Sequence, residues 1–170
     1  MEFTQKSSEE FKELLKKHSL APKNAKIDDM ASVHDALYEL KRYISEESMG
    51  QIWPEDIGTD QDANVDYEGY LNGFQNFSDG ELSFEGLTSK MDGDLIEIKF
   101  MDGSDEIVWK FEQYSDSFSS EFIAFLFEYS RIRGENQLID LLSEDMFEFA
   151  YVPNQIGDFL RDHELFEQLA

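Results

Sequence analysis

The residues best suited to chemistry lie in an acidic stretch, GTDQDANVDYEGY, whose oxygen-bearing side chains are spaced like the start of a calcium-binding loop. In an EF-hand, Asp60, Asp62 and Asn64 would supply ligand positions 1, 3 and 5. Position 6 requires a glycine for the sharp turn and is Val65, while position 12 requires a bidentate carboxylate and is Leu71. Two defining requirements fail, and we predict neither a metal site nor another cofactor.

The three histidines do not indicate catalysis either. His34 lies beside the apolar stripe of an expected helix, and His18 stands near a helix C-terminus, where the helix dipole favours a cationic imidazole. His163 and Glu167 are spaced to face one ion, but two ligands do not complete a metal site.

Known catalytic motifs are absent from the sequence. The chain has no cysteine, no nucleophile elbow, and no glycine pattern of a phosphate-binding or dinucleotide-binding loop. A pair of carboxylates could do acid–base work, but 38 Asp and Glu residues always supply some pair. We therefore nominate no catalytic residue and predict that the chain is not an enzyme.

Aromatic side chains are interleaved with acidic ones in a segment without Lys or Arg, residues 43–89. Trp and Tyr anchor protein interfaces, and charge steers and selects the partner. The alternative is that the rings fill the core beneath a solvated loop, and both interpretations stay open for Trp53, Tyr67 and Tyr70. The predicted partner-binding residues are Trp53, Glu55, Asp56, Asp60, Asp62, Asp66, Tyr67, Glu68 and Tyr70.

The net charge of −24 is distributed unevenly along the chain. Residues 1–42 carry eight basic and eight acidic side chains, residues 43–89 carry 11 acidic and no basic ones, and residues 90–170 carry 19 acidic and six basic ones. Solubility alone would not require this asymmetry. The charge argues against nucleic acids and anionic membranes as direct ligands, since both are bound through basic patches. It favours a basic protein as the partner.

Length and composition favour a folded protein. A chain of 170 residues with 41% hydrophobic and 14% aromatic side chains has enough apolar material for a core. The N-terminal segment is charged and amphipathic, unlike a secretory signal, and no apolar run is long enough to span a membrane. We expect a soluble, cytoplasmic protein with a single domain over residues 1–170.

Hydrophobic periodicity predicts an α+β fold. Strict alternation of apolar residues on either side of Asp102-Gly103 indicates a hairpin, whereas QLIDLL is ambiguous between helix and strand. The segment at about 49–80 shows no clear period, and we predict an acidic, glycine-rich loop there. The other predicted elements are helices over 7–18, 28–48, 118–133 and after Pro153, and an antiparallel meander sheet of three to four strands at about 81–113 and 146–152.

These observations predict an acidic inhibitory binding protein, of the kind that neutralises a basic, nuclease-type bacterial toxin as its immunity protein. A nuclease needs a basic cleft for a phosphate backbone, and a small acidic protein can cover that cleft. A DNA mimic that blocks a nucleic-acid-binding protein is the first alternative, and a carboxylate- or metal-dependent enzyme is the second. The sequence predicts neither the identity of the partner nor the oligomeric state.

Overall fold

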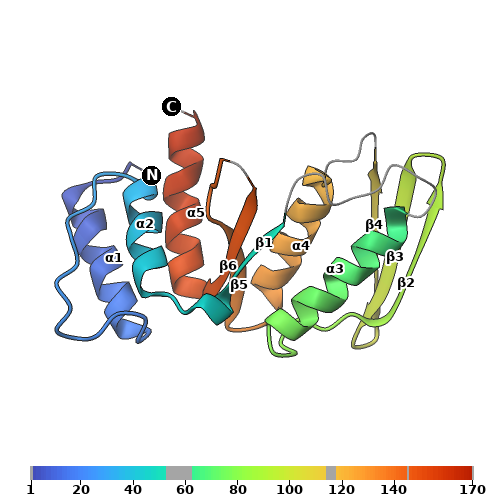
Figure 1. Ribbon diagram of the computed structural model, residues 1–170, viewed down its shortest axis with the longest axis horizontal. Coiled ribbons are helices and arrows are strands. Elements are labelled where there is room, and N and C mark those ends of the chain that lie inside the picture. The colour runs from blue at the N-terminus through green and yellow to red at the C-terminus, as the bar shows by residue number, and fades with distance from the viewer. Residues whose placement is uncertain (1, 53–62, 114–117, 145, 170) are drawn as a thin grey trace. The chain divides into compact units, whose positions relative to one another are not determined.

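The computed structural model describes residues 2–52, 63–113, 118–144 and 146–169 (Figure 1). The chain divides into two compact units, each of which is described by itself. The prediction of a single domain stays a prediction, because division into units does not decide whether they unfold together. Unit 1 comprises Met1–Gly50, Glu135–Leu141 and Phe149–Ala170, and unit 2 comprises Gln51–Gly134 and Leu142–Glu148.

Three helices form most of unit 1, and they are α1 (Gln5–Lys17), α2 (Val33–Tyr43) and α5 (Asn154–Leu169). Helix α1 begins at a capping box in which Thr4 and Ser7 bond each other's backbone N–H groups. Its buried Phe11 stacks on Phe159 of α5, with ring centroids 5.1 Å apart. The apolar stripes of these helices thus meet in one core.

Helix α2 is shorter than the predicted 28–48 helix at both ends, because its N-cap lies further along the chain and the backbone is already extended at Ile44. The Ser32 hydroxyl accepts the N–H of Asp35, and the Asp35 carboxylate accepts the N–H of Ala31. This reciprocal pair starts the helix at Val33. The earlier acidic residues, Asp28 and Asp29, form ion pairs with Arg42 and Lys12 instead.

A second group of strands forms a sheet of order β1-β6-β5. Strand β5 pairs antiparallel with β6, and Leu138 lies opposite Tyr151. The ambiguous segment QLIDLL is therefore a strand through Asp140. The strands are β1 (Met49–Ile52), β5 (Asn136–Asp140) and β6 (Phe147–Pro153). A 3₁₀ turn at Glu46–Ser48 precedes β1.

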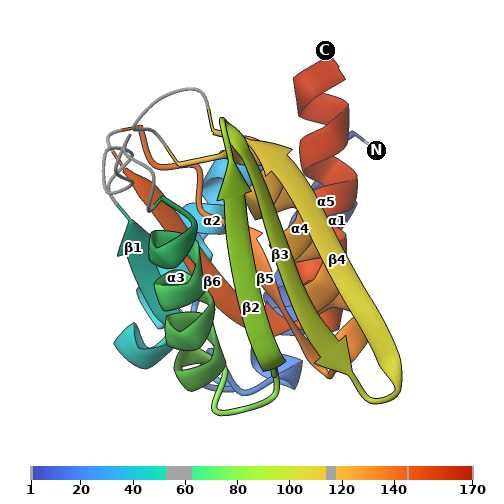
Figure 2. The same ribbon diagram turned by 90° about the vertical axis from the view of Figure 1, so that its right-hand side faces the viewer.

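Unit 2 contains the predicted meander, in strand order β2-β3-β4. Gly93 and Gly103 have positive φ at the two hairpin turns, a conformation that glycine adopts without steric cost. Helix α3 lies against β2 and β3, and α4 lies against β4. Figure 2 looks onto the face of this sheet that points away from α4. The bounds are β2 Glu85–Asp92, β3 Leu95–Asp102, β4 Asp105–Glu112, α3 Ala63–Phe77 and α4 Ser120–Arg133.

The prediction of a loop over residues 49–80 is wrong for most of that segment. Met49–Ile52 is a strand and Ala63–Phe77 is a helix, while residues 53–62 lie outside the described residues. Two glycines within α3, Gly69 and Gly73, lower its intrinsic helix propensity and suggested a loop. Burial of one face of α3 against the sheet overrides that propensity.

The α+β class is confirmed. Both sheets have three strands, and the described part of the chain contains five α-helices, the additional one being α3. The meander at about 81–113 is present as predicted. The strand predicted at 146–152 is β6, and it pairs in the other sheet.

Candidate partner-binding surface

The predicted partner-binding residues fall into two groups in the structure. Five of them, Trp53, Glu55, Asp56, Asp60 and Asp62, lie outside the described residues. The other four lie on α3, where Ala63, Tyr67, Leu71 and Phe74 are buried at helical spacing. Because helical positions differ in direction, the four predicted residues on α3 do not share one surface.

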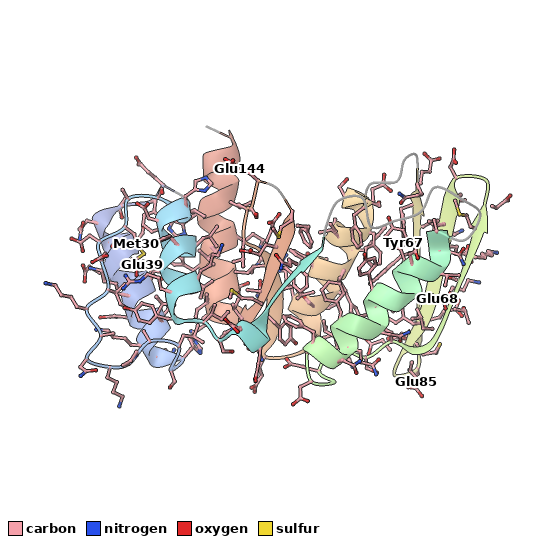
Figure 3. All side chains as sticks on the ribbon, viewed as in Figure 1. Met30, Glu39, Tyr67, Glu68, Glu85 and Glu144 are labelled. Atoms are coloured by element: carbon pink, nitrogen blue, oxygen red, sulfur yellow. The ribbon has the colours of Figure 1, made fainter. Side chains whose placement is uncertain are left out.

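Tyr67 is a core residue, and its prediction as a partner contact is corrected. Its side chain is fully buried in unit 2 (Figure 3), and its ring lies 4.9, 5.3 and 4.6 Å from the rings of Phe111, Phe118 and Phe122. The ring stabilises the contact between α3, the end of β4 and α4. It offers no surface to a partner.

The hydroxyl of Tyr67 joins segments on either side of residues 114–117. It donates a hydrogen bond to Oε1 of Gln113 and accepts one of 2.9 Å from the N–H of Ser119, the N-cap of α4. Burial raises the pKa of Tyr67 to about 12. The hydroxyl therefore keeps its proton across the physiological pH range and remains a donor.

The remaining three predicted residues on α3 are half-buried. Glu68 accepts a hydrogen bond of 2.6 Å from the hydroxyl of Ser89 on β2, which fixes its carboxylate against the sheet (Figure 3). The ring of Tyr70 meets Phe118 edge to face at 4.9 Å. Asp66 lies in the first turn of α3, where the helix dipole favours a carboxylate. Each of these three side chains therefore has a structural role, in addition to any contact that it makes with a partner.

The charge of the chain is concentrated in unit 2. Unit 2 carries 22 acidic and five basic side chains, a net charge of −17, whereas unit 1 carries 16 acidic and nine basic side chains, a net charge of −7. None of the described Asp and Glu residues of unit 2 is buried as a whole, although Oε1 of Glu148 is enclosed, so most of this charge lies at the surface of the unit. Exposed carboxylates flank both hairpin turns, at Asp92, Asp94, Asp105, Glu106 and Glu112.

All five basic side chains of unit 2 form ion pairs within the unit. The three lysines surround one carboxylate, Glu97, and Arg131 and Arg133 pair with Glu128 and Asp102 at 2.8 and 2.7 Å. Five cations thus gather on only three carboxylates. The rest of the unit 2 surface keeps its negative charge.

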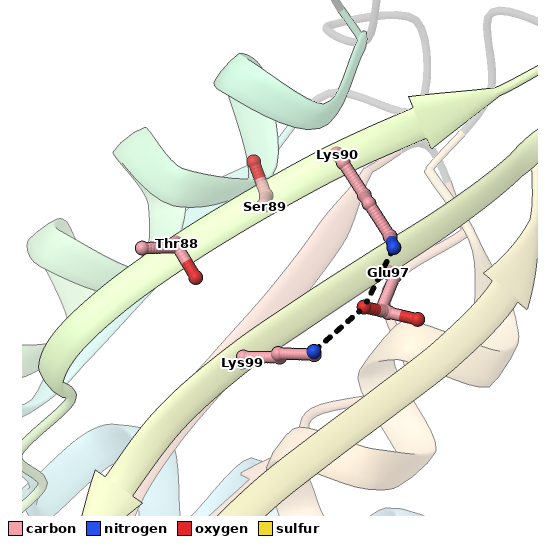
Figure 4. A pocket seen from close by; sticks show the side chains of 5 residues that line it. All are labelled: Thr88, Ser89, Lys90, Glu97 and Lys99. Atoms are coloured by element: carbon pink, nitrogen blue, oxygen red, sulfur yellow. Dashed lines mark ion pairs between the residues drawn. The ribbon is translucent and has the colours of Figure 1, made fainter.

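Glu97 is the centre of the lysine cluster, on the sheet face away from α3 and α4 (Figure 4). Lys90, Lys99 and Lys110 place their Nζ atoms 3.5, 3.4 and 3.6 Å from its carboxylate oxygens. Burial raises the pKa of Glu97, but hydrogen bonds and charges from Lys99 and Lys90 outweigh it, so that the pKa lies below its ordinary value. The Glu97 carboxylate is therefore ionised at neutral pH.

Sequence analysis missed this cluster, although a signal for it was present. Ile96, Ile98 and Phe100 were expected to alternate inward along β3, and the intervening Glu97 and Lys99 therefore face outward. The cross-strand neighbours of Glu97 depend on the register of three strands. Composition and periodicity do not give that register.

The histidines have structural partners or lie at the surface. In unit 1, buried His163 donates from Nδ1 to the carbonyl oxygen of Phe159, and its Nε2 lies 3.3 Å from Oγ of Ser7. Nε2 of His18 bonds the amide oxygen of Gln155 at 2.8 Å. Among the residues that the structure describes, no group of three or more His, Asp and Glu side chains is placed to hold one metal ion.

The described helices are all too short or too polar to cross a membrane. Comparisons with protein-family models, with curated proteins and with solved structures find no match to this chain.

Proposed function

We propose that the chain is an acidic inhibitory binding protein, and specifically an immunity protein that covers the basic substrate cleft of a nuclease-type toxin. The observation that carries the proposal is the charge of unit 2, a net −17 in which five cations are gathered on three carboxylates. Such a surface attracts basic proteins and repels nucleic acids and anionic membranes.

Complementary charge would give this inhibitor its speed. Electrostatic steering raises association rates by about 10- to 1,000-fold over the neutral rate at low ionic strength. Fast capture matters for an inhibitor whose target is harmful while free. The predicted contacts are those of the sequence analysis without Tyr67, which is buried, together with the exposed carboxylates beside the hairpin turns, such as Asp92 and Asp105.

The arrangement of the described carboxylates favours an inhibitor over a DNA mimic. B-DNA presents a charge about every 1.7 Å along its axis, so a mimic benefits from carboxylates in regular rows. In unit 2 the exposed carboxylates of the meander lie apart, with Asp92 and Asp94 near one turn and Asp105 and Glu106 near the other. Further exposed carboxylates, such as Asp79, Glu121 and Glu128, lie outside the sheet. Recognition would then involve separate acidic groups around the sheet.

A pull-down from the lysate of the source organism, with the intact chain as bait and elution in increasing salt, tests the proposal. We expect one stoichiometric basic protein that is retained into moderate salt and is identified by mass spectrometry. That protein should degrade nucleic acid when purified alone and lose this activity on addition of an equimolar amount of the chain. Its expression should also slow cell growth, and co-expression of the chain should restore growth.

Three results would contradict the proposal. A smear of ribosomal and other basic proteins, all lost at low salt, would show that the charge acts without specificity. A single retained partner that is a repressor or restriction enzyme, and from which duplex DNA displaces the chain, would support the mimic instead. Turnover of a substrate by the chain alone would support an enzyme.

A further inference from the structure

The outer face of the β2–β3–β4 sheet gathers positive charge in an otherwise acidic unit. Strand register places Lys90, Glu97 and Lys110 directly opposite one another, in a row across the three strands. Lys99 follows two residues after Glu97 on the same face, and Thr88 lies opposite Lys99. We call Thr88, Lys90, Glu97, Lys99 and Lys110 the lysine patch.

The patch holds more hydrogen-bond donors than its own carboxylate can accept. Three ammonium groups carry nine N–H donors, whereas the Glu97 carboxylate offers about four lone-pair sites. The N–O distances of 3.4 to 3.6 Å also exceed the 2.7–2.9 Å typical of a charge-assisted hydrogen bond. The lysine side chains are between 43% and 71% exposed, so these donors are accessible from solvent.

Charge and space in the patch suit a small dianion. Three ammonium groups and one carboxylate leave a local charge of +2. A hollow of about 130 Å³ lies beside Thr88, Ser89, Lys90, Glu97 and Lys99 (Figure 4). This volume is well above the roughly 10–15 Å³ that a single water requires on the same measure.

We propose that the lysine patch binds the phosphate group of a small phosphorylated molecule or inorganic phosphate. A phosphate group carries a charge of about −1.5 to −2 at pH 7, which matches the local +2, and its oxygens are strong acceptors. The Thr88 hydroxyl supplies a further donor on the same face. A single carboxylate ligand would neutralise only half of the surplus charge.

Acidic neighbours set the strength and the salt dependence of this site. Asp92 and Glu112 flank Leu95 in the adjacent cross-strand row of the same face, and Glu106 lies opposite Met101 on the other side. Their repulsion acts on a bound anion over a Debye length of about 8 Å at physiological salt. Binding is therefore weak, with saturation in the millimolar range, and it weakens as salt is added. The site is independent of the proposed partner and of the toxin hypothesis.

Backbone amide NMR of the intact chain, titrated with sodium phosphate at constant ionic strength, tests the site. We expect saturable shifts at Thr88–Lys90, Glu97–Lys99 and Lys110. O-phosphoserine, titrated in the same way, distinguishes a phosphomonoester from the free ion by its relative affinity. The double variant Lys99→Gln/Lys110→Gln should weaken binding at least 10-fold, whereas Lys99→Arg should retain it.

Two further variants separate a binding site from a merely structural ion-pair cluster. Lys23→Gln/Lys26→Gln removes two exposed lysines from unit 1, an equal change in charge, and should leave phosphate binding unaltered. Glu97→Gln removes the internal competitor, so it should strengthen phosphate binding several-fold although it loosens the ion pairs. Shifts that do not saturate, or that survive in Lys99→Gln/Lys110→Gln, would overturn the proposal, as would weaker binding in Glu97→Gln.

Discussion

The two units use their basic residues in different ways. In unit 1, cations pair with neighbours from their own or an adjacent segment, as Lys12 does with Glu9 and Asp29, and Arg42 with Glu39 and Asp28. In unit 2, three lysines share a single carboxylate, Glu97, while 22 acidic residues face only five basic ones. Unit 1 therefore carries acidic and basic side chains in more similar numbers, whereas unit 2 is strongly acidic.

Solubility alone would not require the concentration of charge in unit 2. A mixed surface with both signs interspersed is enough to keep a domain soluble, and unit 1 approaches that pattern. Concentrated like charge destabilises the compact state by self-repulsion. A binding role would explain why unit 2 carries this cost.

Reversing charge beside a hairpin turn of unit 2 should have the largest effect. We expect the double variant Asp92→Lys/Asp94→Lys to slow association with the captured basic partner by about 10-fold or more, because steering depends on the local field. Stopped-flow association at low and moderate salt measures the change. The dissociation rate should change less, since substitution of an exposed charge acts mainly on the association rate.

Glu46→Lys/Glu47→Lys is the matched control in unit 1, because both carboxylates are exposed and the change in net charge is identical. This control should slow association by much less than the unit 2 variant. Equal slowing by both variants would show that only the total charge matters. The distinction between the units would then have no bearing on capture.

Tyr67→Phe should destabilise unit 2 by about 2–3 kcal/mol, because Oε1 of Gln113 and the N–H of Ser119 each lose the hydrogen bond to the Tyr67 hydroxyl. Fluorescence of Trp109, which is buried in unit 2, reports urea unfolding in a Trp53→Phe background. Amide exchange at Leu138 on β5 reports unit 1 in the same samples.

Tyr38→Phe in unit 1 is the chemical control, since Tyr38 is 66% exposed. It should change stability by less than about 0.5 kcal/mol. A small effect of Tyr67→Phe would contradict the role given to its hydroxyl. If Tyr67→Phe lowers the protection against amide exchange equally in both units, this would support the single cooperative domain that the sequence predicts.

Sequence periodicity was a good guide to the fold where side chains alternate or repeat in a regular way. Ile96, Ile98 and Phe100 marked β3, and the apolar run over 118–133 marked a helix, since local patterns define those elements. The helix α4 is buried on one face only, and its Ile132 is 72% exposed. In α3 the helical spacing of Tyr67, Leu71 and Phe74 was present, but neighbouring glycines favoured a loop. Packing against a sheet, which is a nonlocal effect, decided that case.

The candidate site was harder to predict than the fold, because a binding surface depends on burial and register. Tyr67 and Tyr70 look alike in an acidic segment, yet Tyr67 lies within the buried stripe of α3 with Leu71, whereas Tyr70 is only half-buried. Likewise, Lys90 and Lys110 are distant in sequence and meet only through β3. No local pattern contains that information.

Alanine in place of two helical glycines should have opposite effects in the two units. In α5 of unit 1, a Cβ on Gly157 would lie 2.3 Å from Cδ of Gln137, and Gln137 is held by Asn154 and Asp158. Gly157→Ala should therefore lower the free energy of unfolding by roughly 1–2 kcal/mol. In α3 of unit 2, a Cβ on Gly73 meets nothing within 4 Å, and Gly73→Ala should stabilise by about 0.5–1 kcal/mol.

Urea denaturation followed by circular dichroism measures both glycine variants. If Gly157→Ala leaves the free energy of unfolding unchanged, Gln137 can move without losing its hydrogen bonds. Destabilisation by Gly73→Ala would contradict the open surface described around α3. Gly69→Ala, also on α3 and also without a neighbour within 4 Å, provides a replicate in the same helix.

The smallest expected effect concerns Glu97 and its dependence on pH. The lysines lower the pKa of Glu97 in the folded state, so its ion pairs stabilise the protein above the unfolded pKa of about 4.3 and this contribution is lost as pH falls through the folded pKa. Glu97→Gln should thus reduce stability at pH 7, and the difference from the wild type should shrink below about pH 4.

Glu112→Gln, which removes an exposed carboxylate beside the other acidic residues, should instead leave stability at pH 7 unchanged or slightly raised, because it relieves repulsion. A difference between wild type and Glu97→Gln that is the same at pH 7 and pH 3 would show that the lysines of unit 2 do not hold this carboxylate in its charged form.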